Sequence, residues 1–231
     1  MTSSVSADGT PPAGSAPPAD ASLRNEDLFG PESLQFQDQF DTRRLAGRLV
    51  EHFVRPGLSP EQAEFVAGCR MVFLATVNAA GQPECTYKGG RPGFIRVLDD
   101  RTLVLPFYDG NGLFSTLGNI RATGKVGLFF IDFEQQYRLR VNGSAQVAEP
   151  DPEADPGALV LVTVTSEVVY DLCERYVHSM RFVAESEYCP APGYQPPAAP
   201  YLAKPLYDGV RPGQPPDEIS GGNGSSAERS T

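Results

Sequence analysis

Seven short segments rich in branched and aromatic residues fill the sequence between residues 71 and 172. Turn-forming stretches such as NAAGQ, DDR and EPDPEADPG separate them, a pattern typical of antiparallel β-strands joined by short loops. The predicted strands are residues 71–77, 83–88, 93–99, 102–108, 125–132, 137–147 and 158–172. Such a set closes most economically as a small antiparallel barrel, so we expect a mainly β fold with a few helices.

Two helices are predicted before the first strand. Between Gln35 and Val54 the apolar residues recur at the helical period with charges between them, which predicts one amphipathic helix. Its expected apolar face consists of Phe36, Phe40, Leu45, Leu49 and Phe53. A second helix begins near Ser59, because Ser59, Pro60 and Gln62 provide an N-cap, a first-turn proline and a capping-box partner.

One more helix is predicted between two strands, and another after the last strand. The inserted helix has its apolar residues on one face, begins after the turn DGNG and ends at Gly124. These apolar residues are Leu113, Leu117 and Ile120. A short terminal helix is predicted over residues 173–183, with Tyr176, Val177 and Met180 buried.

The two ends of the chain have a low-complexity composition. Residues 1–24 and 211–231 are rich in small and polar residues and are expected to be disordered, which leaves residues 25–210 as one domain. The N-terminus lacks the basic start and apolar core of a secretory signal, and no apolar run approaches the ~20 residues needed to cross a bilayer. A cytoplasmic protein without a membrane partner is therefore expected.

Charge and metal-ligand chemistry exclude two classes of function. The formal net charge is −10, with 29 acidic and 19 basic residues, which opposes binding to a nucleic-acid backbone. The four cysteines form no CxxC pair, and His52 and His178 are the only histidines, so no metal site is expected. Cys173 and His178 are interpreted as packing residues, and no catalytic acid or base is assigned.

The stretch YKGGRPGF, residues 87–94, is unusual for a strand because it holds three glycines, a proline and two cations. Glycine in a strand either marks a bulge or lets the backbone approach a ligand closely. Lys88 and Arg91 would supply the positive charge that a bound phosphate needs. A bulged hairpin with solvated cations is the alternative reading.

Two further motifs follow in the sequence. In DGNGLFST, residues 109–116, a glycine-flanked turn leads into a helix whose first amides could hold a phosphate, with Ser115 and Thr116 as added donors. The alternative is a helix start capped by Asp109 or Asn111. In YRLRVNG, residues 137–143, the polar residues alternate with apolar ones, so they project either into a cleft or into solvent. Those polar residues are Arg138, Arg140 and Asn142.

In this order, the motifs resemble the FMN-binding split-barrel family of pyridoxamine 5'-phosphate oxidase-like proteins. The resemblance runs over residues 73–147, and its landmarks are KGG-PGF, GN, GNI and LRVNG. It implies a six-stranded antiparallel split barrel, a homodimer, and FMN bound in two equivalent clefts at the subunit interface. It also implies hydride transfer through the flavin N5 atom on a small-molecule substrate, with NADH or NADPH as a candidate electron donor.

The residue patterns and the resemblance together assign cofactor-binding roles to twelve residues. Those expected at the phosphate are Lys88, Arg91, Ser115 and Thr116. Those expected along the flavin are Thr86, Gly89, Gly90, Asp109, Gly110 and Asn111, and those expected at the ring edge or the substrate are Arg138 and Arg140.

The chain also departs from the oxidases that give the family its name. They carry a basic pair in the inserted helix where this chain has Ser115 and Thr116. The chain also lacks tryptophan, and its C-terminus is of low complexity. These departures argue against vitamin B6 oxidation. A binding or sensing protein that holds flavin, deazaflavin or haem without turnover is the alternative function, although His178 is the only axial-ligand candidate outside the first helix.

Overall fold

The strands pair into one antiparallel sheet in the computed structural model, which describes residues 23–212. The predicted tails, residues 1–24 and 211–231, lie outside the described residues except at their inner ends. The sheet order is β2-β1-β5-β6-β7-β4-β3. The strands are β1 (Met71–Val77), β2 (Pro83–Gly89), β3 (Arg96–Val97), β4 (Thr102–Tyr108), β5 (Lys125–Asp132), β6 (Tyr137–Ala148) and β7 (Ala158–Leu172).

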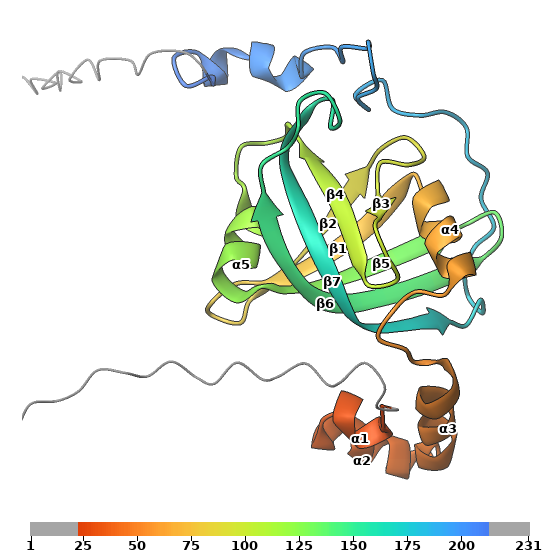
Figure 1. The fold of residues 1–231 in the computed structure, drawn as a ribbon. Helices are drawn as coiled ribbons and strands as arrows, with labels where there is room; N and C mark the ends of the chain where they lie inside the picture. The colour runs from red at the N-terminus through yellow and green to blue at the C-terminus, as the bar shows by residue number, and fades with distance from the viewer. Residues whose placement is uncertain (1–22, 213–231) are drawn as a thin grey trace, which may run out of the picture.

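The sheet curves round on itself, with β2 and β3 as its two edges (Figure 1). The predicted mainly β split-barrel fold is therefore confirmed, with seven paired strands instead of six. The additional strand, β3, is only two residues long. The longer strand expected at residues 93–99 does not form, because Gly93 has a φ of 87° and Phe94 donates its backbone N–H to Arg91, closing a turn.

Alternate residues of the strands fill the barrel interior, as the period of a β-strand requires. Every second side chain of β1, β5 and β6 is buried, whereas the residues between them are more accessible. Burying a side chain of this size contributes about 1.5–3 kcal/mol through removal of apolar surface from water. The innermost residues include Val72, Leu74, Leu128, Phe130, Leu139, Val141, Val162 and Val164.

Two predicted helices form, although Leu113, predicted on the apolar face of the inserted helix, lies before that helix and is 75% exposed. In α4 (Pro60–Gly68), Ser59 Oγ accepts the backbone N–H of Gln62, whose side chain accepts the N–H of Ser59 in return. The inserted helix is α5 (Ser115–Thr123), which ends at Gly124 in the left-handed conformation. Its N-cap is Phe114, not Asp109 or Asn111 as the alternative interpretation expected.

The single helix predicted from Gln35 to Val54 is wrong. The chain forms α2 (Pro31–Gln39) and α3 (Arg43–Phe53), preceded by α1 (Asn25–Leu28), and the break lies at Asp41, whose φ is 51°. The five side chains expected to be buried are 48–67% exposed. Figure 1 shows the reason, since α1–α3 pack together to one side of the barrel.

No helix within residues 23–212 is long and apolar enough to cross a membrane.

The chain after β7 runs along the barrel as an irregular segment, residues 173–199, followed by the short helices η1 (Pro200–Ala203) and η2 (Pro205–Tyr207) (Figure 1). The helix predicted over residues 173–183 is wrong. Val177 is buried, but Tyr176 is 93% exposed. The segment is held instead by the turn between β5 and β6, because Met180 donates its backbone N–H to Phe133 and Phe182 donates to the Glu134 carboxylate.

Candidate functional site

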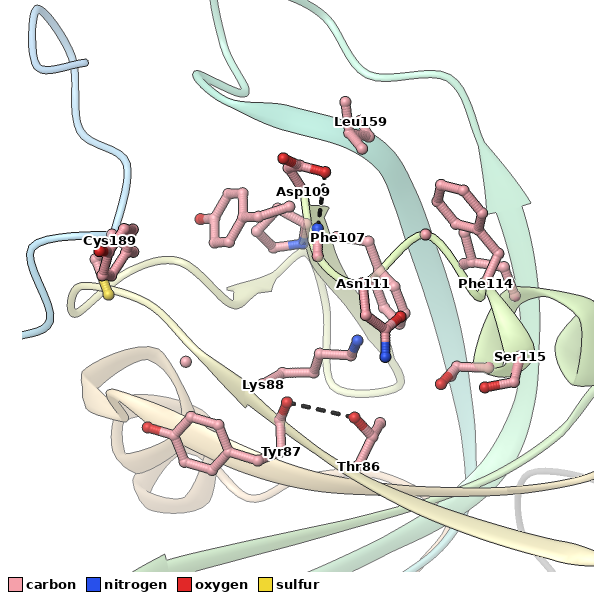
Figure 2. A pocket seen from close by; sticks show the side chains of 18 of the residues that line it. Thr86, Tyr87, Lys88, Phe107, Asp109, Asn111, Phe114, Ser115, Leu159 and Cys189 are labelled. Atoms are coloured by element: carbon pink, nitrogen blue, oxygen red, sulfur yellow. Dashed lines mark hydrogen bonds between the residues drawn. The ribbon is translucent and has the colours of Figure 1, made fainter. Parts of the chain in front are cut away.

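A cavity of about 420 Å³ lies between β2, the end of β4, the start of α5 and the segment after β7 (Figure 2). Its size is within the range of about 300–1,000 Å³ that holds small ligands and cofactors. Eight predicted site residues line it, namely Thr86, Lys88, Gly89, Asp109, Gly110, Asn111, Ser115 and Thr116. The cavity therefore brings together most of the YKGGRPGF and DGNGLFST motifs.

The wall formed by β2 follows from strand alternation. Glu84, Thr86 and Lys88 are two residues apart and half-buried, whereas Cys85 and Tyr87 between them are exposed. β2 is an edge strand that pairs only with β1, and this alternating face lies toward the end of β4 and the start of α5, which line the same cavity. Three polar side chains of one strand thus meet the cavity together.

Lys88 is the only lysine or arginine among the described residues that line this cavity. Its ammonium lies 4.1 Å from the centroid of the Phe107 ring on β4, a distance suited to a cation–π contact across the opening between β2 and β4. Figure 2 shows Lys88 and Asn111 pointing into the same space. Burial lowers the pKa of Lys88, and the nearby Glu84 carboxylate opposes this shift.

Glu84 links β2 to the start of α5. Ser115 Oγ donates to Glu84 Oε1 at 2.5 Å, and Thr116 Oγ1 donates to Oε2 at 3.1 Å. Thr76 of β1 and Asn119 of α5 also donate to Oε2, at 3.1 and 3.2 Å. The two hydroxyls predicted to hold a phosphate therefore hold a carboxylate of the chain itself.

The hydrogen bonds also set the charge of Glu84. Burial by itself would raise the pKa of this carboxyl, but the hydroxyl donors Ser115, Thr76 and Thr116 outweigh burial and hold the pKa below its ordinary value. Lys88 adds to the lowering. Sequence reasoning missed Glu84 as a site residue, although its spacing from Thr86 and Lys88 on one strand face was a usable signal.

The loop between β4 and α5 forms the next wall. Asp109 Oδ1 accepts the N–H of Gly110 at 2.8 Å, and Asn111 Oδ1 accepts the N–H of Leu113 at 3.0 Å, so both side chains fold the loop back on itself. Tyr201 from η1 donates its hydroxyl to the Gly110 carbonyl at 2.8 Å. The C-terminal region therefore holds this loop in place.

The irregular segment after β7 supplies side chains that the sequence did not predict. Ser186, Tyr188 and Cys189 line the cavity, and Glu185 next to them forms an ion pair with Arg91 at 3.3 Å. Glu185 also lies 3.7 Å from Arg70. Arg91 thus anchors the segment and does not line the cavity.

Gly90, Arg138 and Arg140 also lie outside the cavity lining. Gly90 is buried, and a Cβ atom there would lie 2.4 Å from Phe94 Cγ, so its lack of a side chain serves the packing of its own loop. On β6, Arg138 donates to the Cys173 carbonyl and Arg140 donates to the Tyr170 hydroxyl at 3.2 Å. Both arginines thus form hydrogen bonds with their own chain, and their predicted contact with a cofactor stays a prediction.

A second cavity of about 610 Å³ lies between α4, the turn after β5 and residues 180–182. Its walls combine apolar side chains such as Phe65 and Phe133 with acidic ones such as Glu61 and Glu64. None of the predicted site residues lines it. Within residues 23–212, no group of three or more histidine, cysteine or acidic residues is arranged to hold a metal ion.

Known proteins are similar to part of this chain. Residues 58–166 match the family model described as pyridoxamine 5'-phosphate oxidase. No curated protein sequence matches the chain. Among solved structures, HupZ from Group A Streptococcus is 20% identical, with 54% of this chain and 100% of that one covered at a TM-score of 0.42.

Two further solved structures are similar over half of the chain. A protein of Lactobacillus delbrueckii described as a candidate pyridoxamine 5'-phosphate oxidase is 28% identical, with 50% of this chain and 94% of that one covered at a TM-score of 0.41. The heme storage protein HutZ from Vibrio cholerae is 17% identical, with 50% and 95% covered at a TM-score of 0.36.

Proposed function

Because the chain belongs to the pyridoxamine 5'-phosphate oxidase-like split-barrel family, we propose that it is an FMN-dependent oxidoreductase that binds flavin between β2, β4 and α5. Members of this family often bind flavin. The observation that carries the proposal is the cavity itself, in which eight of the twelve predicted cofactor residues meet. Arg138 and Arg140 are proposed at the ring edge only from a second copy of the chain, since both lie outside the cavity of their own chain.

Apart from the Glu84 carboxylate, which is bound to Ser115 and Thr116, the residues that line the cavity offer groups suited to a flavin mononucleotide. Lys88 offers an ammonium to the phosphate, and the hydroxyls of Ser115 and Thr116 lie at the start of α5, where the helix dipole favours an anion. Phe107 gives the cavity an apolar wall. Gly89 also lines the cavity, although the Tyr87 ring covers the side on which a Cβ of Gly89 would lie.

The chemistry of the reaction belongs to the cofactor. When bound, FMN would supply hydride transfer at its N5 atom, with NADH or NADPH as a candidate hydride donor and oxygen or a small-molecule substrate as the electron acceptor. The chain binds the phosphate, orients the ring and limits the access of water. No catalytic residue is assigned to this chain.

The proposed assembly is a homodimer with cofactor at the subunit interface. One feature supports it: α2 and α3 expose apolar side chains such as Phe36 and Leu49. In such a dimer the arginines of β6 would meet the flavin of the second copy. Light scattering at micromolar concentration is expected to give twice the mass of the chain. A strictly monomeric protein contradicts this binding mode.

The absorption spectrum of the purified protein tests the function. We expect a yellow protein that releases FMN on denaturation, and stopped-flow reduction by NADH or NADPH then separates an enzyme from a carrier. A colourless protein that ignores added FMN overturns the proposal. A haem spectrum would also overturn it, although neither His52 nor His178 lines the cavity to serve as an axial ligand.

A further inference from the structure

The carboxylate of Glu84 occupies the place where a ligand phosphate is expected. Its two oxygens accept four hydrogen bonds, from Thr76 on β1 and from Ser115, Thr116 and Asn119 on α5. α5 receives no hydrogen bond from the side chain of its own N-cap residue, Phe114. Glu84 therefore gives the start of this helix the negative charge that its dipole favours.

The charges around Glu84 make a second anion unfavourable. Of the described residues that line the cavity, Lys88 carries a positive charge, whereas Glu84 and Asp109 carry negative charges. Tyr188 and Cys189 face the same cavity from the segment after β7. A phosphate that approached Ser115 and Thr116 would meet the Glu84 carboxylate within hydrogen-bonding distance of the same hydroxyls, and like charges at such separations repel strongly.

We propose that Glu84 is a specificity-determining residue, an internal anion that the ligand phosphate must displace from Ser115 and Thr116 before a phosphate-bearing flavin can bind. This inference rests on the proposed flavin function. A flavin without phosphate, such as riboflavin, needs no displacement. Glu84 thus reduces the preference of the cavity for FMN over riboflavin, and removing its charge increases that preference.

Flavin titrations of the full-length protein test this role. The probes are FMN and riboflavin, followed by flavin fluorescence, and the proteins are the wild type, Glu84→Gln and a control, Glu32→Gln, which removes one charge from the exposed start of α2. We expect Glu84→Gln to bind FMN about tenfold more tightly and riboflavin within about twofold of the wild type, since only FMN carries the phosphate. Glu32→Gln is expected to change neither affinity.

A second variant guards against a folding defect. Glu84→Ala empties the position, and its melting temperature shows whether the barrel remains folded; the folded variant is expected to gain FMN affinity as Glu84→Gln does. If FMN binding weakens in both variants, or if FMN and riboflavin affinities change alike, the inference is wrong while the flavin function stands.

Inorganic phosphate separates this inference from the proposed function. Calorimetry without flavin is expected to detect phosphate binding to Glu84→Gln and much weaker binding to the wild type. If neither the wild type nor the Glu84 variants bind FMN or riboflavin, the proposed function fails. In that case, phosphate binding by Glu84→Gln but not by the wild type would still support Glu84 as the internal anion. Equal phosphate binding to both proteins, or none to either, overturns that role.

Discussion

β2 carries one cation, Lys88, and β6 carries two, Arg138 and Arg140, yet only β2 presents its charged face to the cavity. Lys88 on β2 is held over the Phe107 ring inside the cavity, whereas Arg138 and Arg140 on β6 are bound to the Cys173 carbonyl and the Tyr170 hydroxyl. The difference follows from what lies opposite each face: the end of β4 and the start of α5 for β2, and Tyr170 and Cys173 for the arginines of β6. Alternation sets which side chains share a face, and the elements packed beside that face decide what those side chains meet.

The comparison predicts that changes in β6 act on stability. Gly143 lies at a bulge where β6 meets β7, and a Cβ atom there would lie 2.0 Å from the backbone oxygen of Thr165. Because backbone must move to relieve this overlap, Gly143→Ala is expected to lower the free energy of unfolding by about 3 kcal/mol in urea titrations.

Gly118→Ala is the matched control for this substitution. A Cβ atom at Gly118 in α5 would have no neighbouring atom within 4 Å, and alanine favours a helix, so this variant should be as stable as the wild type or more stable by up to about 1 kcal/mol. An unchanged midpoint for Gly143→Ala would show that the β6–β7 pairing is looser than described.

Changes in β2 should instead act on the ligand. Lys88→Glu replaces the only cation among the described residues that line the cavity and is expected to weaken FMN binding about 100-fold, or about 2.7 kcal/mol, in fluorescence titrations. Lys125→Glu makes the same change on the exposed start of β5 and should leave the affinity unchanged. Equal affinities for Lys88→Glu and the wild type would remove Lys88 from the phosphate site.

The hydrogen bonds that Glu84 accepts make the stability of the fold depend on pH. Because the pKa of Glu84 in the folded protein lies below the ordinary value of 4.5, its carboxylate stabilises the fold above about pH 4.5. That contribution is lost as pH falls through the lowered pKa. At neutral pH, Glu84→Gln is therefore expected to have a melting temperature about 3 °C below that of the wild type. Well below pH 4.5, the two proteins are expected to have the same melting temperature.

Calorimetric melting curves over this pH range check the expectation. Glu32→Gln serves as the control, because it removes a carboxylate from the exposed start of α2. A difference between Glu84→Gln and the wild type that persists in acid would mean that packing, and not the charge of Glu84, stabilises the start of α5.

The sequence predicted those parts of the fold whose partners lie a few residues away. Ser59 and Gln62 cap α4, and Gly124 ends α5, as local motifs indicated. Long-range partners decided the rest. Glu84 binds side chains 31 to 35 residues further along the chain in α5, and the segment predicted as a terminal helix is held by Phe133 and Glu134. Neither arrangement leaves a periodic pattern in the sequence.

The smallest effect on FMN binding is expected for a cation that already forms an ion pair within the chain, such as Arg91. It follows β2 in the YKGGRPGF motif, but it pairs with Glu185 at 3.3 Å, and both side chains are partly exposed. A pair of this kind contributes about 0–1 kcal/mol, so Arg91→Ala should weaken FMN binding by about twofold.

A double-mutant cycle separates the two roles open to Arg91. If Arg91 acts by holding the segment that carries Tyr188 and Cys189, Glu185→Ala should weaken FMN binding as much as Arg91→Ala does, and the double variant should be no weaker than either. If Arg91 contacts the phosphate, Arg91→Ala alone should lose affinity, and Glu185→Ala, which frees the cation, should gain it. The second result would extend the phosphate site beyond the face of β2.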